Sequence, residues 1–182
     1  HGWVFDIGIG TRLAIERLEN GMTPELAGGF DERDNGNGSL MRILPLVLHI
    51  KDLDIEERYE WTKKISSITH AHVRSVMACF YYLEFAKKII EGKDKFQAFN
   101  ELQSELTQYF EQRKINPIEI HKFHRLLNED ISKMEEDNIK SSGYVMDTLE
   151  AAIWCILTTN NYKDAVLKAV NLGHDTDTTG AV

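Results

Sequence analysis

The amino-acid sequence predicts an all-α fold, and two observations lead to this expectation. Apolar residues recur three and four positions apart along most of the 182-residue chain, and strict alternation of apolar and polar residues is nearly absent. The 12 glycines and 3 prolines are fewer than an average chain of this length carries, which argues against a turn-rich all-β fold. Because 42% of the residues are hydrophobic, the chain can build one core. We therefore expect a single helical domain over residues 1–182, most of one domain that is truncated at both ends.

Eight helices are expected from the apolar spacing. They cover residues 11–18, 39–50, 55–68, 73–90, 96–113, 118–127, 144–157 and 164–171. The first is closed at Gly21 and the fourth at Gly92, because glycine readily adopts the left-handed conformation that ends a helix. Pro45 is tolerated in the second only in its first turn or as a kink, and Pro117 takes the favoured first position of the sixth. The other helices rest on the apolar spacing alone.

Charge and apolar-run length limit the classes of partner. The chain carries 21 Lys and Arg against 29 Asp and Glu, a net charge of −8, which disfavours nucleic acid as a partner because a phosphate backbone is gripped by cationic side chains. No apolar run approaches the roughly 18 residues that a membrane span needs. Cys79 and Cys155 both fall in apolar helical patterns, which is typical of buried free thiols. We expect a cytoplasmic protein with no membrane partner.

An acidic cluster near the carboxyl end is the first candidate site. Asp175 and Asp177 lie two positions apart and are flanked by threonine hydroxyls, including that of Thr178. These hard oxygen donors suit Mg²⁺, Mn²⁺ or Ca²⁺ much better than zinc. The alternative is a helix N-terminus, where Asp and Thr side chains cap exposed backbone amides.

A glycine-rich loop is the second candidate site. Gly36, Asn37, Gly38 and Ser39 lead directly into an apolar helix. Glycine lets the backbone approach a ligand closely, and free amides at a helix start attract an anion. The spacing matches neither the dinucleotide-binding fingerprint nor a Walker loop, and Arg42 could add positive charge beside a pyrophosphate. The alternative is a capped helix that follows a flexible loop.

Two further segments carry polar or aromatic side chains at the expected ends of helices. His70 and His72 lie at a helix–helix junction, where capping or hydrogen bonding competes with metal binding. Tyr144 begins a helix, and its ring either packs in the core or stacks on a base.

Five short blocks occur in a specific order along nearly the whole chain. They are Phe5-Asp6-Ile7-Gly8 with Thr11, Gly36-Asn37-Gly38-Ser39-Leu40-Met41-Arg42-Ile43-Leu44-Pro45, Thr69-His70-Ala71-His72, Ser142-Gly143-Tyr144-Val145 with Thr148-Leu149-Glu150-Ala151-Ala152, and Asn171-Leu172-Gly173-His174-Asp175-Thr176-Asp177-Thr178. In this order they resemble the ADP-ribosylglycohydrolase family, which includes the dinitrogenase-reductase-activating glycohydrolases and the ADP-ribosyl-acceptor hydrolases.

The resemblance implies a compact orthogonal bundle of helices and a hydrolase that cleaves the glycosidic bond at the distal ribose. The substrate would be an ADP-ribosylated protein or an ADP-ribose-containing small molecule. The resemblance also implies two Mg²⁺ or Mn²⁺ ions, with Asp175, Asp177 and Thr178 as metal ligands and the two aspartates as catalytic residues. The family's other metal motif, Thr-Asp-Asp, does not occur in these 182 residues.

The same resemblance assigns the substrate-binding residues. By motif match, the ADP-ribose pocket would be lined by Gly36, Asn37, Gly38, Ser39, Met41, His70 and Tyr144. Within this set, His70 would lie near the distal ribose and Tyr144 near the adenosine end. Two alternatives stay open: a non-catalytic remnant that binds ADP-ribose, and a helical interaction module.

Overall fold

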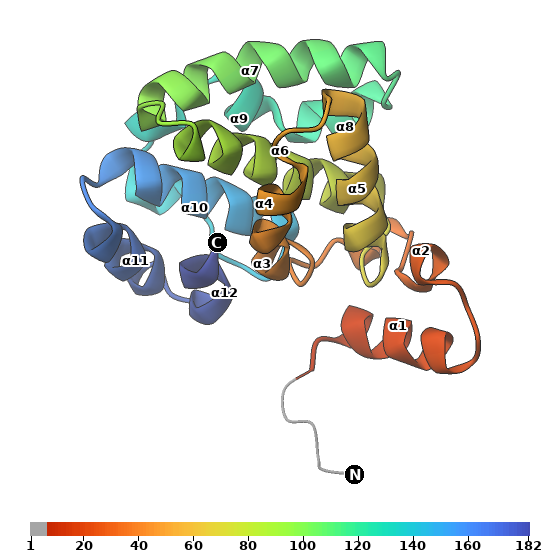
Figure 1. The fold of residues 1–182 in the computed structure, drawn as a ribbon. Helices are drawn as coiled ribbons and strands as arrows, with labels where there is room; N and C mark the ends of the chain where they lie inside the picture. Colours follow the sequence, from red (N-terminus) through yellow and green to blue (C-terminus); the bar gives the residue numbers. More distant parts are fainter. Residues whose placement is uncertain (1–6) are drawn as a thin grey trace.

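The computed structural model describes residues 7–182 and confirms the all-α prediction (Figure 1). Two isolated β-bridges join Gly29 to His70 and Gly36 to Tyr144. Phe5 and Asp6, which belong to the first of the five blocks, lie outside the described residues. Within residues 7–182, no helix combines the length and the apolar character that crossing a bilayer requires.

Most helices follow one another closely, and the longest connections are residues 28–39 and 129–144. The α-helices are α1 (Ile9–Glu19), α2 (Pro24–Ala27), α3 (Leu40–Ile43), α4 (Val47–Ile50), α5 (Ile55–Ser67), α6 (Val73–Ile90), α7 (Lys95–Gln112), α8 (Pro117–Lys122), α9 (His124–Asn128), α10 (Val145–Thr158), α11 (Tyr162–Asn171) and α12 (Thr176–Ala181). Four 3₁₀ turns lie between them, namely η1 (Glu32–Asp34), η2 (Leu44–Leu46), η3 (Ile131–Lys133) and η4 (Glu136–Asn138).

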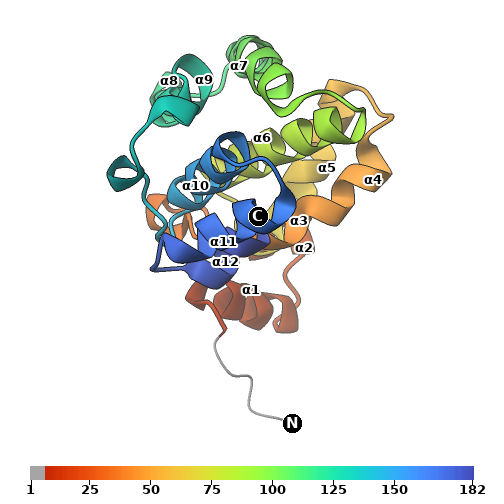
Figure 2. The ribbon, with the colours of Figure 1, turned by 90° about the vertical axis from the view of Figure 1, so that its left-hand side faces the viewer.

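Helix α6 forms the centre of the core. It packs against α5, α7, α10, α3 and α4, and Figures 1 and 2 show it enclosed by these helices. Its middle is apolar on every side, and Phe80, Tyr81 and Phe85 are each at most 2% exposed. A helix with this composition is stable only when other elements cover it on all faces. Helix α6 is therefore the scaffold on which the other elements are placed.

Local sequence signals set most helix boundaries. The side chains of Asp54, Asp94 and Asn116 accept hydrogen bonds from first-turn amides of α5, α7 and α8, which satisfies donors that have no partner inside the helix. Gly21 and Gly92 adopt φ angles of +86° and +87° after α1 and α6, as the two glycine stops predict.

Besides α12, a helix that only the capping alternative for the acidic cluster predicts, the structure differs from the predicted helices in three places. The segment 39–50 is divided into α3, η2 and α4, and Pro45 lies in the 3₁₀ turn η2, so the predicted continuous helix does not form. The segment 118–127 is broken at Phe123 into α8 and α9. Helix α2, Pro24–Ala27, is too short to produce a periodic apolar pattern and was not expected.

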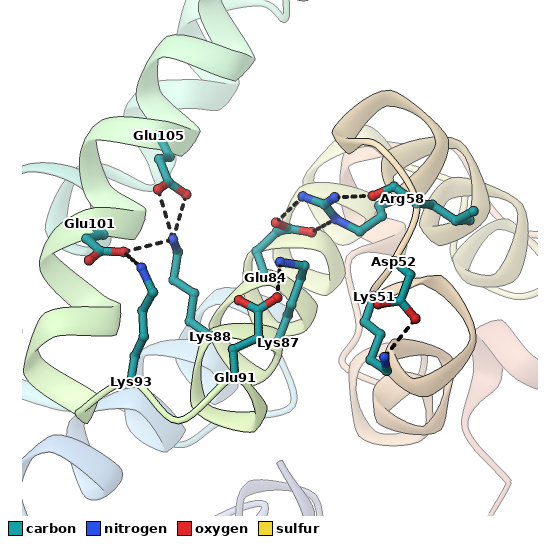
Figure 3. A network of polar contacts seen from close by, with 11 residues as sticks. Lys51, Asp52, Arg58, Glu84, Lys87, Lys88, Glu91, Lys93, Glu101 and Glu105 are labelled. Carbon is teal, nitrogen blue, oxygen red and sulfur yellow. Dashed lines mark hydrogen bonds and ion pairs between the residues drawn. The ribbon is translucent and has the colours of Figure 1, made fainter.

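Buried ion pairs join α6 to its neighbours (Figure 3). The guanidinium of Arg58 on α5 donates to both carboxylate oxygens of Glu84 on α6, at 2.6 and 2.7 Å, and both side chains are nearly buried. On the same helix, Lys88 donates to Glu101 and Glu105 of α7. By contrast, the pair between Lys51 and Asp52 is exposed.

Replacing Glu84 tests the buried pair. Glu84→Gln leaves the Arg58 charge buried without its partner, so we expect the free energy of unfolding to fall by about 3–5 kcal/mol in urea titrations. Asp52→Asn makes the same chemical change in an exposed pair and should cost less than about 1 kcal/mol. Equal losses in the two variants would contradict this role for the Arg58–Glu84 pair.

Candidate functional site

The side chain of Asn37 ties the glycine-rich loop to two distant segments. Its amide nitrogen donates to the Thr148 hydroxyl at 2.8 Å and to Oδ2 of Asp175 at 2.6 Å. Its backbone amide donates to the carbonyl oxygen of Gly143 at 3.1 Å, and its own carbonyl accepts from the amide of Met41 at the same distance. Because Asn37 is only 8% exposed, these bonds fix the loop in one conformation.

A second asparagine holds the beginning of the loop. The Asn35 carbonyl accepts from the Val145 amide at 3.0 Å, and its side-chain oxygen accepts from the Ser75 hydroxyl of α6 at 2.9 Å. Its side-chain nitrogen donates to the carbonyl of Glu32. The loop is therefore bonded on one side to α6 and on the other to the start of α10.

The acidic cluster lies beside this loop. Asp175 is the residue before α12, and its backbone amide donates to the carbonyl of Ser141 at 3.0 Å. Its carboxylate caps no amide of α12 among the described residues, so the capping alternative does not describe this side chain. Instead the carboxylate accepts from Asn37. The two candidate sites predicted from separate parts of the chain are thus in direct contact.

The other two predicted metal ligands lie on α12, which packs against α3 (Figure 2). Asp177 is in the first turn and exposed, and among the described residues it forms no hydrogen bond or ion pair. Thr178 is buried, and its hydroxyl lies 4.0 Å from the sulfur of Met41 on α3. Met41, predicted to line the pocket, is therefore in contact with the acidic turn.

His70 is buried among three glycines. Its Nδ1 is 2.8 Å from the Thr69 hydroxyl. A methyl group added to Gly38 would lie 2.9 Å from the ring carbon Cε1, and one added to Gly10 or Gly36 would lie 3.3 Å from Nε2. Burial lowers the pKa of His70 to about 4, and the nearby positive charge of Arg42 contributes in the same direction. The imidazole is therefore neutral at pH 7.

Arg42 contacts the loop rather than pointing away from it. Its guanidinium donates to the carbonyl of Gly38 at 2.7 Å and to that of Ile65 at 3.2 Å. Ser39 precedes α3 without capping it, and its hydroxyl accepts from the buried thiol of Cys79. The capped-helix alternative therefore predicts the start of the helix correctly, but the Ser39 side chain does not form the capping hydrogen bond.

Cys79 and Cys155, both within the described residues, are buried free thiols as predicted.

The acidic turn offers an incomplete set of ligands for a hard cation. Asp175, Asp177 and Thr178 carry the carboxylate and hydroxyl oxygens that Mg²⁺ and Mn²⁺ prefer. Among residues 7–182, no group of three or more His, Cys, Asp or Glu side chains could hold a metal ion by itself. The residues present fit such a cation chemically, and further oxygens would have to complete its coordination shell.

A large cavity of about 1140 Å³ lies elsewhere, between α4, α6, α10, α11 and α12. Its lining is mostly apolar and includes none of the predicted site residues. The predicted site residues of the glycine-rich loop and the acidic turn therefore do not line this cavity.

Comparison with known proteins identifies the family of this arrangement. The family model described as ADP-ribosylglycohydrolase matches residues 1–182. The chain belongs to the ADP-ribosylglycohydrolase family. The solved structure of an ADP-ribosylglycohydrolase-related protein complex superposes with a TM-score of 0.74 at 27% sequence identity, covering 96% of this chain and 56% of that one. The expected family fold is confirmed.

Three named relatives of this chain are bacterial proteins. ADP-ribosylarginine hydrolase Tri1 of Serratia proteamaculans is 30% identical and that of Pseudomonas putida 31% identical, each over the whole chain and 45% of the relative. The ADP-ribosyl-[dinitrogen reductase] glycohydrolase of Rhodospirillum rubrum is 28% identical over 97% of this chain and 52% of the relative. The chain thus spans about half the length of these curated relatives.

Sequence reasoning missed several groups that shape the site. The hydroxyl of Thr148 and the carbonyls of Ser141 and Gly143 hold Asn37 and Asp175 in place. Thr148 belongs to one of the five blocks, so the sequence indicates that it matters but not that its hydroxyl accepts a hydrogen bond from Asn37. Nothing in the local pattern around Arg74, which lies beside Tyr144, indicated a place near the loop.

A methyl group on Gly38 tests the packing around His70. Gly38→Ala forces the imidazole to move, and such overpacking costs about 1–3 kcal/mol of unfolding free energy. In a His70→Ala background the clash is absent, so the same substitution should cost much less. Urea unfolding of the four proteins measures this coupling, and additive losses would show that the two residues do not touch.

The low pKa of His70 predicts a pH dependence of stability. Between its ordinary pKa of 6.5 and about 4, the unfolded chain binds a proton at His70 that the folded chain does not. The unfolding free energy should therefore fall as the pH drops through this window, by up to about 3 kcal/mol. His70→Gln should lose this contribution. Urea titrations at pH 7 and pH 4.5 measure it, and an equal pH dependence in both proteins would refute the burial effect.

Proposed function

We propose that the protein is a hydrolase that removes ADP-ribose from a modified side chain or small molecule by cleaving the glycosidic bond at the distal ribose. One observation carries this proposal: the carboxylate of Asp175 is hydrogen-bonded to Asn37, so the loop that we propose for anions adjoins the carboxylate that we propose for cations. Family membership and the names of the relatives support the same chemistry.

The loop would bind the diphosphate. Among the described residues, the backbone amides of Gly36, Gly38 and Ser39 donate no hydrogen bond, so they are available to phosphate oxygens. Glycine at two of these positions lets the His70 ring pack directly against the loop backbone. Asn37 would act indirectly, since its own hydrogen bonds hold the loop conformation.

The acidic turn would hold the metal. We propose that Asp175, Asp177 and Thr178 bind Mg²⁺ or Mn²⁺, two ions being expected, with Asp175 and Asp177 as the catalytic residues. Bound metal would supply charge stabilisation and orient a water near the anomeric carbon. The hydrogen bond from Asn37 to one oxygen of Asp175 leaves the other oxygen available as a ligand.

The remaining residues would contact the two sugar ends. The neutral imidazole of His70 would border the distal ribose, where it can donate or accept a hydrogen bond without adding charge. The ring of Tyr144 would pack at the adenosine end, and Met41 would line the pocket between α3 and the acidic turn. We propose an ADP-ribosylated protein in the cytoplasm as the partner, since the relatives are named for ADP-ribosylated arginine and dinitrogen reductase.

The amides of the glycine-rich loop that are unbonded among the described residues favour one second candidate. These amides could bind a diphosphate whether or not a metal ion is bound beside them. The second candidate function is therefore ADP-ribose binding without turnover.

Asp175→Asn separates the metal role from the structural one. The substituted amide can still accept the hydrogen bond from Asn37, but the charge that attracts a divalent cation is gone. We expect release of ADP-ribose from an arginine-modified protein to fall by roughly 100-fold or more. The rise in melting temperature caused by Mn²⁺ should also be lost, with the helical circular dichroism unchanged.

Two further variants complete this experiment. Asp177→Asn should behave like Asp175→Asn, and Asp52→Asn, an exposed carboxylate outside the site, should behave like wild type. Full turnover in Asp175→Asn and Asp177→Asn would remove the metal assignment. Binding of ADP-ribose by the wild type without turnover would favour the second candidate.

A further inference from the structure

A buried arginine lies beside Tyr144. Arg74, in the first turn of α6, has a side chain only 4% exposed. Its Nε and Nη2 donate to the two carboxylate oxygens of Glu119 on α8, both at 2.8 Å, and Nη2 also donates to Glu32 at 3.2 Å. The two-bond contact with Glu119 fixes the plane of the guanidinium.

The same guanidinium lies beside an aromatic ring of the proposed site. Its central carbon is 5.9 Å from the centre of the Tyr144 ring, within the range of a cation–π contact. The backbone of Tyr144 forms a β-bridge with Gly36, and the carbonyl of Glu32 accepts from the side chain of Asn35. Arg74 thus contacts Tyr144 and Glu32, and Glu32 in turn accepts a hydrogen bond from Asn35, the residue before the loop.

Stability alone does not account for a buried arginine here. A buried ion pair contributes little net stability compared with apolar residues of the same volume, and here its two bonds to Glu119 set the orientation of the guanidinium. A lysine could not reproduce two parallel bonds to Glu119 while its charge also lies beside the Tyr144 ring. The arrangement is therefore suited to holding Tyr144 at one orientation.

We propose that Arg74 is a positioning residue that holds the Tyr144 ring against the glycine-rich loop and thereby sets affinity for the nucleoside end of an ADP-ribose ligand. This inference rests on the proposed function of the loop. Arg74 itself does not touch the ligand; it acts through Tyr144. Glu119 acts one step further away, by orienting Arg74.

The test is a double-mutant cycle in ADP-ribose affinity, measured by calorimetry with ADP-ribose as the probe. Arg74→Met and Tyr144→Ala should each raise the dissociation constant about tenfold. If Arg74 acts through Tyr144, the double variant should bind no more weakly than Tyr144→Ala alone. Arg33→Met, at an exposed arginine just before the loop, should bind like wild type. In turnover assays, Arg74→Met should raise KM while kcat stays near the wild-type value.

Each outcome decides the proposal. If Arg74→Met does not fold, Glu119→Gln takes its place. Glu119→Gln should raise the dissociation constant for ADP-ribose about threefold in the wild-type background. In the Tyr144→Ala background it should have no effect. If the wild type binds ADP-ribose and Arg74→Met has the same dissociation constant, the positioning role is wrong. It is also wrong if the losses of affinity in the two single variants multiply in the double variant. In both cases the proposed function still stands. A wild type that does not bind ADP-ribose would overturn both.

Discussion

The side-chain amide of Asn37 is the constraint on which the site depends. It uses both of its hydrogens, one on Thr148 and one on Asp175, which lie 111 and 138 residues further along the chain. A buried amide left without an acceptor costs free energy, so the three segments are stable only when they meet. This one side chain therefore determines where the acidic turn lies relative to the glycine-rich loop, and the proposed chemistry requires that relation.

Neighbouring elements hold the segments that meet at Asn37 in place. Helix α6 crosses the core, and in its first turn Arg74 donates to Glu32 and Ser75 donates to Asn35, the residue before the loop. His70 fills the space between the glycines and stays neutral because burial disfavours its charged form. The site thus rests on the end of a buried helix and not on a free loop, an arrangement that holds reacting groups in a fixed geometry.

The sequence allowed much of the fold to be predicted, because most helices carry their own signals. Amphipathic spacing marks α5 and α7, and Gly92 marks the end of α6. The break at Phe123 and the short helix α2 have no such signal, since one turn of helix depends on tertiary contacts more than on local pattern.

The candidate site could be predicted in composition but not in geometry. The order of the blocks identified the glycine loop, His70, Tyr144 and the acidic turn. The contacts that join them link residues more than a hundred positions apart, and a single sequence contains no record of such pairings. Arg74 shows the same limit, because its partners Glu119 and Glu32 come from other elements.

The most direct measurement of the central claim is the coupling between metal and ligand. If the acidic turn and the glycine-rich loop form one site, each ligand must change the affinity for the other by the same factor. Calorimetric titration of ADP-ribose with and without saturating Mn²⁺ gives this factor. We expect Mn²⁺ to tighten ADP-ribose binding by roughly tenfold, which corresponds to about 1.4 kcal/mol. Identical ADP-ribose affinity with and without Mn²⁺ would contradict it.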